Sequence, residues 1–246
     1  MTIVEVKVMG FAAKIYEIKD AIDFGSSLKK LQEFKSIESY PRETGDPIDL
    51  VTSILDLKQN EDSLSGIFTR DFVVPRYFHR KLAEDLVTEE IPFWIIPFKQ
   101  RAFLIVVGPS GSAGKKKLLT AHVANKISKI LFDRIGVIVE AKISHKTLKE
   151  LHESNPQATT LVWFDDVDLP GVQKLCLAGS GLADTEMYTN YIEHGKIWYV
   201  VFKVQKRGIS VGITRNSVVT LFSKSTKTDF ITYINEDLLE LIEQAS

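Results

Sequence analysis

The spacing of hydrophobic residues predicts a similar series of elements in each half of the chain. The first half is predicted to form a strand, a helix, two hairpins and a long helix, over residues 2–8, 18–34, 50–58 with 64–74, 91–98 with 102–108, and 115–132. A short additional helix is predicted over residues 76–87. The second half is predicted to form a strand, a helix, four strands and a closing helix, over residues 136–143, 145–154, 160–168, 196–204 with 209–214, 218–222, and 229–242.

Individual residues also match between the halves, in the same order. Trp94 and Phe98 return as Trp198 and Phe202, each 104 positions later. The apolar stripe of the long helix returns in the closing helix with an offset of 111 positions. Matches that keep their order are the pattern of an internal duplication.

The repeated unit predicts an α+β fold with a pseudo-twofold axis. A curved antiparallel sheet with helices on one face would bury a single core. The first half is residues 1–134, the second is residues 135–246, and together they are expected to form one continuous pseudo-symmetric domain.

This order of strands and helices resembles the duplicated fold of the TATA-box-binding protein family, over nearly the whole chain. The resemblance is one of topology, and no DNA-contacting motif of that family is matched residue by residue. It therefore implies a fold more than a function. In that family the concave sheet face grips the minor groove of nucleic acid.

Composition indicates a folded intracellular protein. Of the 246 residues, 44% are hydrophobic and 26% are charged, so disorder is disfavoured. The net charge of −1 predicts no bulk attraction to nucleic acid or to a membrane. A single cysteine, Cys176, excludes an intrachain disulfide, and no signal peptide or membrane-spanning stretch is evident, which favours the cytoplasm.

Positive charge is concentrated in the middle of the chain. Between Lys99 and Lys149 there are eleven Lys and Arg residues and only two acidic residues. The candidate anion-binding residues are Lys99, Lys115, Lys116, Lys117, Lys126, Lys129 and Lys203. A cationic helix face can contact phosphates, so nucleic acid or an acidic protein surface is the expected partner. The alternatives are a solvated helix face, or self-association with a compensating acidic stretch into a homo-oligomer.

Two aromatic pairs occupy matching positions on predicted strands. Because side chains alternate along a strand, Trp94 with Phe98, and Trp198 with Phe202, are each expected on one face. On an open face such rings would stack on bases. The alternative is that both pairs form the core against the helices.

A glycine-rich segment between a strand and a helix resembles a phosphate-binding loop. It runs from Gly108 to Lys115, and its glycines would let backbone amides contact phosphate. Five residues separate Gly108 from Gly114, one more than the usual pattern, and the hydroxyl that would bind magnesium is absent. Phosphate or nucleotide binding at this loop is therefore an alternative function.

No set of residues has the spacing of a catalytic or metal site. Asp165, Asp166 and Asp168 lack a further ligand, and the separation of His145 and His152 is too long for one zinc ion. Ser180, with Asp184 and His194 downstream, lacks the G-x-S-x-G elbow, and Cys176 has the apolar neighbours of a buried thiol.

The sequence thus predicts a non-catalytic binding protein with no metal and no cofactor. It would contact a nucleic acid or a protein through a saddle-like sheet and a basic helix. Nucleotide binding at the Gly108 loop and a role as a structural subunit of a complex are the alternatives.

Overall fold

The computed structural model describes residues 10–42, 46–60, 63–108 and 113–243 as an α+β protein whose strands form antiparallel ladders. The chain divides into two compact units. We call Tyr16–Val139 the N-terminal unit. Glu140–Ser246 together with Met1–Ile15 form the C-terminal unit. Strand β1 (Phe11–Ile18) is shared between them, and the strand predicted over residues 2–8 lies outside the described residues.

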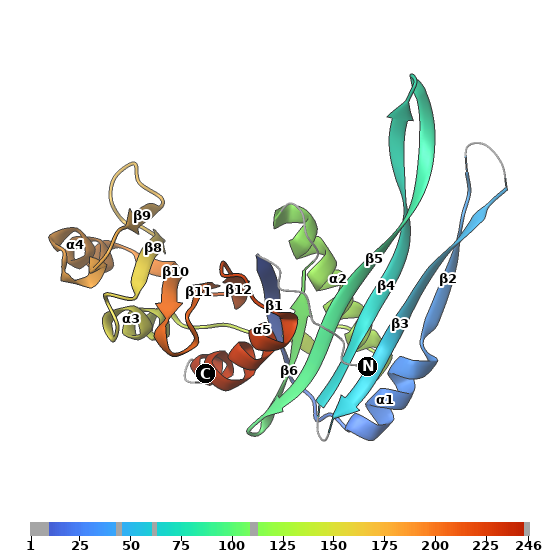
Figure 1. The fold of residues 1–246 in the computed structure, drawn as a ribbon, viewed down its shortest axis with the longest axis horizontal. Helices are drawn as coiled ribbons and strands as arrows, with labels where there is room; N and C mark the ends of the chain where they lie inside the picture. Colours follow the sequence, from blue (N-terminus) through green and yellow to red (C-terminus); the bar gives the residue numbers. More distant parts are fainter. Residues whose placement is uncertain (1–9, 43–45, 61–62, 109–112, 244–246) are drawn as a thin grey trace. The chain divides into compact units, whose positions relative to one another are not determined.

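The sheet of the N-terminal unit follows chain order, β2-β3-β4-β5-β6 (Figure 1). Its strands are β2 (Lys35–Tyr40), β3 (Ile48–Asn60), β4 (Ser63–Phe78), β5 (Lys81–Phe98) and β6 (Arg101–Val107). The two predicted hairpins are confirmed as β3–β4 and β5–β6. The unit also contains α1 (Phe24–Glu33) and α2 (Ala113–Phe132), and β7 (Ile138–Glu140) lies at its boundary.

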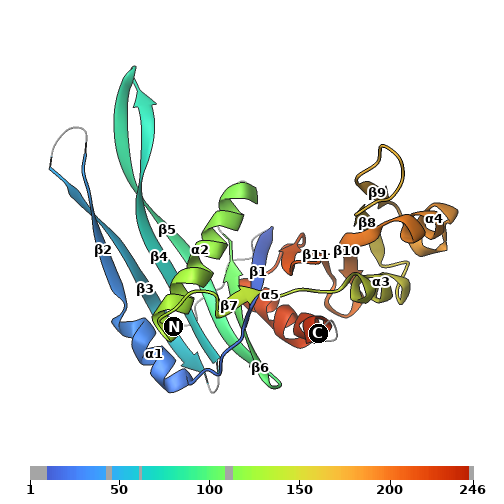
Figure 2. The same cartoon turned by 180° about the vertical axis from the view of Figure 1, so that it is seen from behind.

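Helices α1 and α2 cover one face of this sheet and bury a core (Figure 2). Phe68 and Phe93 from the sheet cluster with Val123 and Ile127 of α2 and Leu31 of α1, and all five are 0% exposed. Burial of each such side chain contributes about 1.5–3 kcal/mol. The other sheet face carries partly exposed side chains along β2 to β5.

Strands β4 and β5 continue past the rest of the sheet as a two-stranded ribbon, which we define as residues 71–88 (Figure 1). The β3–β4 ladder ends at Thr52 opposite Arg70, and the β5–β6 ladder ends at Phe93 opposite Val106. The helix predicted over residues 76–87 is therefore wrong. His79 and Arg80, with φ of 48° and 64°, form the two-residue turn that joins the strands.

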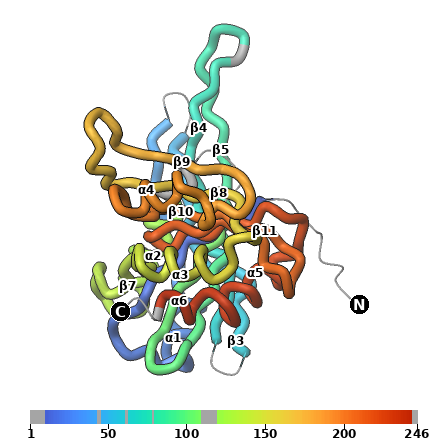
Figure 3. Tube along the Cα trace, turned by 90° about the vertical axis from the view of Figure 1, so that its left-hand side faces the viewer, coloured from blue at the N-terminus to red at the C-terminus, as the bar shows by residue number. Residues whose placement is uncertain are grey.

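The C-terminal unit has the strand order β1-β12-β11-β10-β8-β9 (Figure 1), and β8 to β11 are also labelled in Figure 3. Its remaining strands are β8 (Thr159–Asp165), β9 (Leu175–Ala178), β10 (Lys196–Val204), β11 (Ile209–Thr214) and β12 (Val218–Leu221). The helices are α3 (His145–Glu153), α4 (Glu186–His194), α5 (Lys227–Tyr233), a π-helical turn (Ile234–Leu238) and α6 (Leu239–Glu243). The apolar stripe predicted for the closing helix is confirmed, since Phe230, Ile234, Leu238 and Ile242 are buried.

The two hairpins that carry the matched aromatics have different registers. In β5–β6, Phe98 pairs with Arg101 across a two-residue turn. In β10–β11, Phe202 pairs with Val211 across a longer turn. One offset of 104 residues therefore cannot relate both strands of the first hairpin to both strands of the second.

Candidate functional site

The predicted cationic residues are distributed over several places. Lys126 and Lys129 lie on α2, and Lys99 occupies the β5–β6 turn with a φ of 55°. Lys203 lies on β10 of the C-terminal unit. The side chains of Lys115, Lys116 and Lys117 lie outside the described residues, although their backbone belongs to α2.

Lys126 and Lys129 line an open groove of about 450 Å³ in the N-terminal unit. The groove lies among α1, α2 and β2, and we call it the α2 groove. Its lining residues are Lys30, Glu33, Phe34, Ser36, Lys126, Lys129, Ile130 and Asp133. Phe34 and Ile130 also pack against the core, so the apolar part of the lining is anchored in the fold.

The lysines of the α2 groove differ in their partners. The Lys30 Nζ donates to the Leu131 carbonyl at 2.7 Å and lies 3.6 Å from the Asp133 carboxylate. Lys126 and Lys129 make no ion pair or hydrogen bond within the described part of the chain. Their ammonium groups are therefore available to an external anion. Lys129 also lies in the last turn of α2, where a cation stabilises the helix without any ligand.

His122 lies one turn before Lys126 on α2 and is partly buried. Its pKa is lowered, first by burial and then by the charges of Arg70 and Lys126. Its Nε2 is buried without a hydrogen-bond partner, and its ring packs edge-on to Phe68 with 6.0 Å between centroids. Arg70 and Lys126 thus both disfavour protonation of His122, whereas Glu38 favours it.

The first aromatic pair lies on the sheet face away from the helices. Side chains alternate along β5, and Phe93 and Ile95 belong to the core, so Trp94 and Phe98 occupy the other face. Both rings are partly buried, and Lys99 Nζ lies 5.5 Å from the centroid of Phe98.

Along β2 to β5, acidic side chains outnumber basic ones on that sheet face. Along β2 to β5 it carries two lysines and four carboxylates, at Lys35, Lys58, Asp49, Asp71, Glu84 and Glu90. This balance does not favour contact with a phosphate backbone.

The second aromatic pair has different surroundings. Phe202 lies on the same face as the buried Val200 and lines a small groove of about 340 Å³ with Leu151 and Lys203. Trp198 instead lies near Lys174, whose Nζ is 6.0 Å from the ring centroid. The four aromatic rings therefore do not form two equivalent surfaces.

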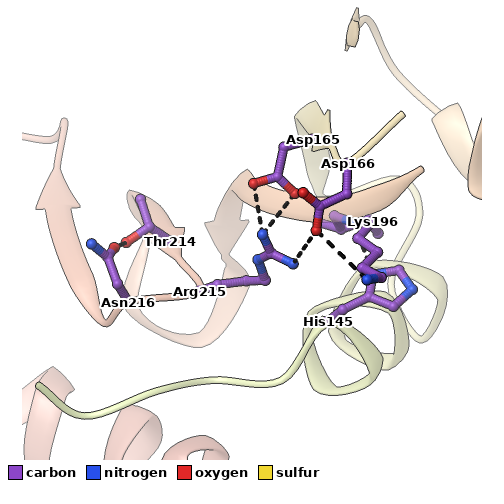
Figure 4. A network of polar contacts seen from close by, with 8 residues as sticks. His145, Asp165, Asp166, Lys196, Thr214, Arg215 and Asn216 are labelled. Carbon is purple, nitrogen blue, oxygen red and sulfur yellow. Dashed lines mark hydrogen bonds and ion pairs between the residues drawn. The ribbon is translucent and has the colours of Figure 1, made fainter. Parts of the chain in front are cut away.

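Two of the three neighbouring aspartates belong to a network of ion pairs (Figure 4). Arg215 donates to both carboxylate oxygens of Asp165, at 2.7 and 2.6 Å. Asp166 lies 3.6 Å from the Lys196 ammonium and 3.8 Å from the Arg215 guanidinium. These cations neutralise the carboxylates, and the described residues contain no group of His, Cys, Asp and Glu suited to a metal ion.

His145 lies beside this network and accepts a hydrogen bond as a neutral imidazole (Figure 4). Its Nδ1 accepts the Ile197 backbone N–H at 2.8 Å. Burial is the main reason that its pKa is lowered, and the charges of Arg215, Lys149 and Lys196 lower it further. The network therefore joins the start of α3 to β8 and β10, which is a structural role.

Other candidate residues are also placed by the structure. His194 Nδ1 lies 2.9 Å from the carboxylate of Asp168. Cys176 is exposed on β9, so the prediction of a buried thiol is wrong. In the Gly108 loop, β6 ends at Val107 and α2 begins at Ala113, while residues 109–112 lie outside the described residues. Phosphate binding there stays a prediction.

Sequence reasoning missed the β-ribbon as a candidate site. Its tip carries His79, Arg80 and Lys81, and Tyr77 beside it is 79% exposed. The available signal was the basic segment between two runs of β-prone residues, which can mark a hairpin turn.

Comparison with known proteins identifies no family. No protein-family profile matches the chain, and no curated protein matches it in sequence. Among the described residues, no helix is long and apolar enough to cross a membrane.

Proposed function

We propose that this chain is a non-catalytic nucleic-acid-binding protein whose contact surface is the α2 groove of the N-terminal unit. The observation that carries the proposal is the pair Lys126 and Lys129, which line one open groove and are unpaired within the described residues. Ammonium groups of this kind contact phosphates without reading base sequence.

The geometry favours backbone contact over base recognition. The α2 groove is open, and its acidic residues Glu33 and Asp133 leave only a modest excess of positive charge. We therefore expect weak, salt-sensitive binding that tolerates changes of sequence. Lys115, Lys116 and Lys117 belong to the same helix, and their contact with phosphate stays a prediction.

Fluorescence anisotropy with labelled single-stranded and duplex oligonucleotides tests the proposal. The wild-type protein should bind at low salt, and Lys126→Ala with Lys129→Ala should weaken binding and lower the slope of log K against log salt by about 1.4–1.8. Lys142→Ala with Lys146→Ala is the matched control, because it removes the same charge from exposed positions of the C-terminal unit.

Two outcomes would contradict the proposal. Wild-type protein that binds no oligonucleotide at low salt would remove the function. Equal losses in the groove variant and in the control would show that overall charge, and not the α2 groove, causes the binding.

We also propose that the two units arose by duplication, with a fold like that of the TATA-box-binding protein. The proposal is supported by the order of elements, since a strand and a helix come first and a long helix closes each half. Counted back from the closing helix, β6 corresponds to β12, β5 to β11 and β4 to β10, and each series is contiguous in the strand order.

This correspondence differs from the sequence matches. It aligns the strand of Trp94 with β11, and not with β10, which contains Trp198. An experimental structure tests the duplication through superposition of the two units. A best superposition that aligns no consecutive strands in this order would exclude it.

A further inference from the structure

Three of the four exposed large apolar side chains of the β-ribbon lie on one face, and Val74 lies on the other. Tyr77, Leu82 and Leu86 are 79%, 41% and 55% exposed. The β4–β5 register continues without a shift from the core to the tip, so all three lie on the face away from the core. Large apolar residues gathered on one exposed face indicate a docking surface.

The exposed apolar surface continues from the ribbon onto the sheet. Leu55 on β3 and Ile37 on β2 occupy the same face and are 49% and 54% exposed. Five of the nine large hydrophobic residues with high exposure in the described chain therefore share this face. Scattered single residues would need no explanation, but this concentration does.

Charge is separated along the ribbon. The turn at the tip carries Arg80 in addition to His79, and Lys81 follows it on the opposite face of the ribbon; the described residues provide no ionic partner for Arg80 or Lys81. The root, on the same face as the apolar residues, carries the carboxylates of Asp71 and Glu90.

Some charges of the ribbon are already paired and do not contribute to this polarity. Arg76 lies 3.1 Å from the Asp85 carboxylate. Glu84 accepts a hydrogen bond from the Tyr40 hydroxyl at 3.2 Å and lies 3.5 Å from Arg42. Glu90 is exposed and has no such partner within the described part of the chain, so it is the acidic residue most available at the root.

We propose that the ribbon of a second copy of this chain docks on this face, antiparallel to the first and related to it by a twofold axis. In that arrangement the basic tip of each ribbon lies over the acidic root of the other, and the apolar residues meet between them. A twofold interface requires a self-complementary surface, and a charge gradient along one ribbon provides it.

The same features disfavour other occupants. Phosphates along this face would meet the carboxylates of Asp71 and Glu90 at the root, so the ribbon does not suit a nucleic acid. The outer edge of β5 is unpaired over residues 81–92, but Pro92, Asp85 and Glu90 hinder open-ended strand addition. A closed pair of ribbons brings no phosphate to these carboxylates and needs no open-ended strand addition.

Charge exchange between two variants tests the proposal. Variant one is Arg80→Glu with Lys81→Glu, and it makes the tip acidic. Variant two is Thr88→Lys with Glu90→Lys, both exposed positions on the docking face, and it makes the root basic. Sedimentation velocity over a concentration series should show a wild-type dimer and, for each variant alone, dimerisation weakened by about tenfold or more.

An equimolar mixture of the two variants should restore the dimer, because both tip–root contacts become attractive in the mixed pair. Leu86→Arg should weaken dimerisation as well. Because Leu86 is exposed, misfolding would not explain that loss. Lys142→Glu with Lys146→Glu is the charge-reversed control in the C-terminal unit.

Clear results would overturn the proposal. A monomeric wild type at high concentration excludes it, and so does a mixture that dimerises no better than either variant alone. These measurements contain no nucleic acid, so their outcome is independent of the proposed function of the α2 groove.

Discussion

At the scale of single residues, the most unusual group is His152 on α3. It is 1% exposed, and neither ring nitrogen has a hydrogen-bond partner in the described structure. Its ring packs edge-on against Tyr188 of α4, with 4.7 Å between centroids. Burial is the main reason that the pKa of His152 is lowered, although the charges of Glu153 and Asp184 oppose this effect.

The lowered pKa of His152 predicts that acid destabilises the C-terminal unit. Unfolded His takes up a proton near its ordinary pKa of about 6.5, whereas the folded form does so only at lower pH. Neutral His152 therefore contributes fully to the stability of the folded protein above the unfolded pKa of about 6.5. This contribution is lost as the pH falls from there toward the lower pKa of the folded form. His152→Phe keeps a ring against Tyr188, so its unfolding free energy should fall less between pH 7.5 and 5.5.

Urea denaturation at the two pH values checks this prediction. His79→Gln, which changes an exposed histidine, is the control. An unchanged pH dependence in the His152 variant would show that this residue is not the source.

At the scale of elements, the two faces of the N-terminal sheet should respond differently to truncation. Phe93 is 0% exposed between the sheet and the helices, so Phe93→Ala should lower the unfolding free energy by about 3–5 kcal/mol. Leu55→Ala changes the opposite, exposed face and should cost less than about 0.5 kcal/mol. Denaturant unfolding of dilute protein measures both, and similar losses would contradict the assignment of the faces.

Elements with a regular apolar period were predictable from the sequence. The helices around residues 115–132 and 145–154 and the strands over residues 196–204 and 209–214 are confirmed, because packing on one side requires that period. The ribbon was not predictable in this way. Its strands are solvated on both faces toward the tip, so no alternation remains, and segments such as Ala83-Glu84-Asp85-Leu86 equally suit a helix.

The candidate site was predictable only in part. Lys126 and Lys129 follow from the helical period of α2, which turns them away from the core. The proximity of Arg70 on β4 to His122 on α2 depends on how α2 packs across the sheet, and no local pattern encodes that packing. The single offset of 104 residues suggested equivalent aromatic pairs, but the register of each hairpin depends on its turn.

At the scale of the whole molecule, the division into units does not follow the midpoint of the chain. Phe11–Lys14 of β1 pair with β12, and the Phe11 ring stacks on Phe230 with 5.9 Å between centroids. A contact between residues so far apart in sequence leaves no local signal, so a division at residue 134 could not anticipate it.

Separate cores predict additive stability effects. Phe93 packs within the N-terminal cluster, whereas Phe164 contacts Tyr188 and Tyr191 of the C-terminal unit, so the two share no neighbour among these contacts. The losses from Phe93→Ala and Phe164→Ala should add within about 0.5 kcal/mol in the double variant. Calorimetry of the four proteins checks this, and a larger deviation would indicate coupling between the cores.

The exposed thiol on β9 provides a direct way to observe assembly. Because Cys176 is the only cysteine in the sequence, a nitroxide can be attached at one defined position without prior mutagenesis. In a twofold pair of chains the two labels would be related by the same axis. Pulsed dipolar spectroscopy would then record a single interspin distance distribution, and dilution with unlabelled protein would reduce its modulation depth.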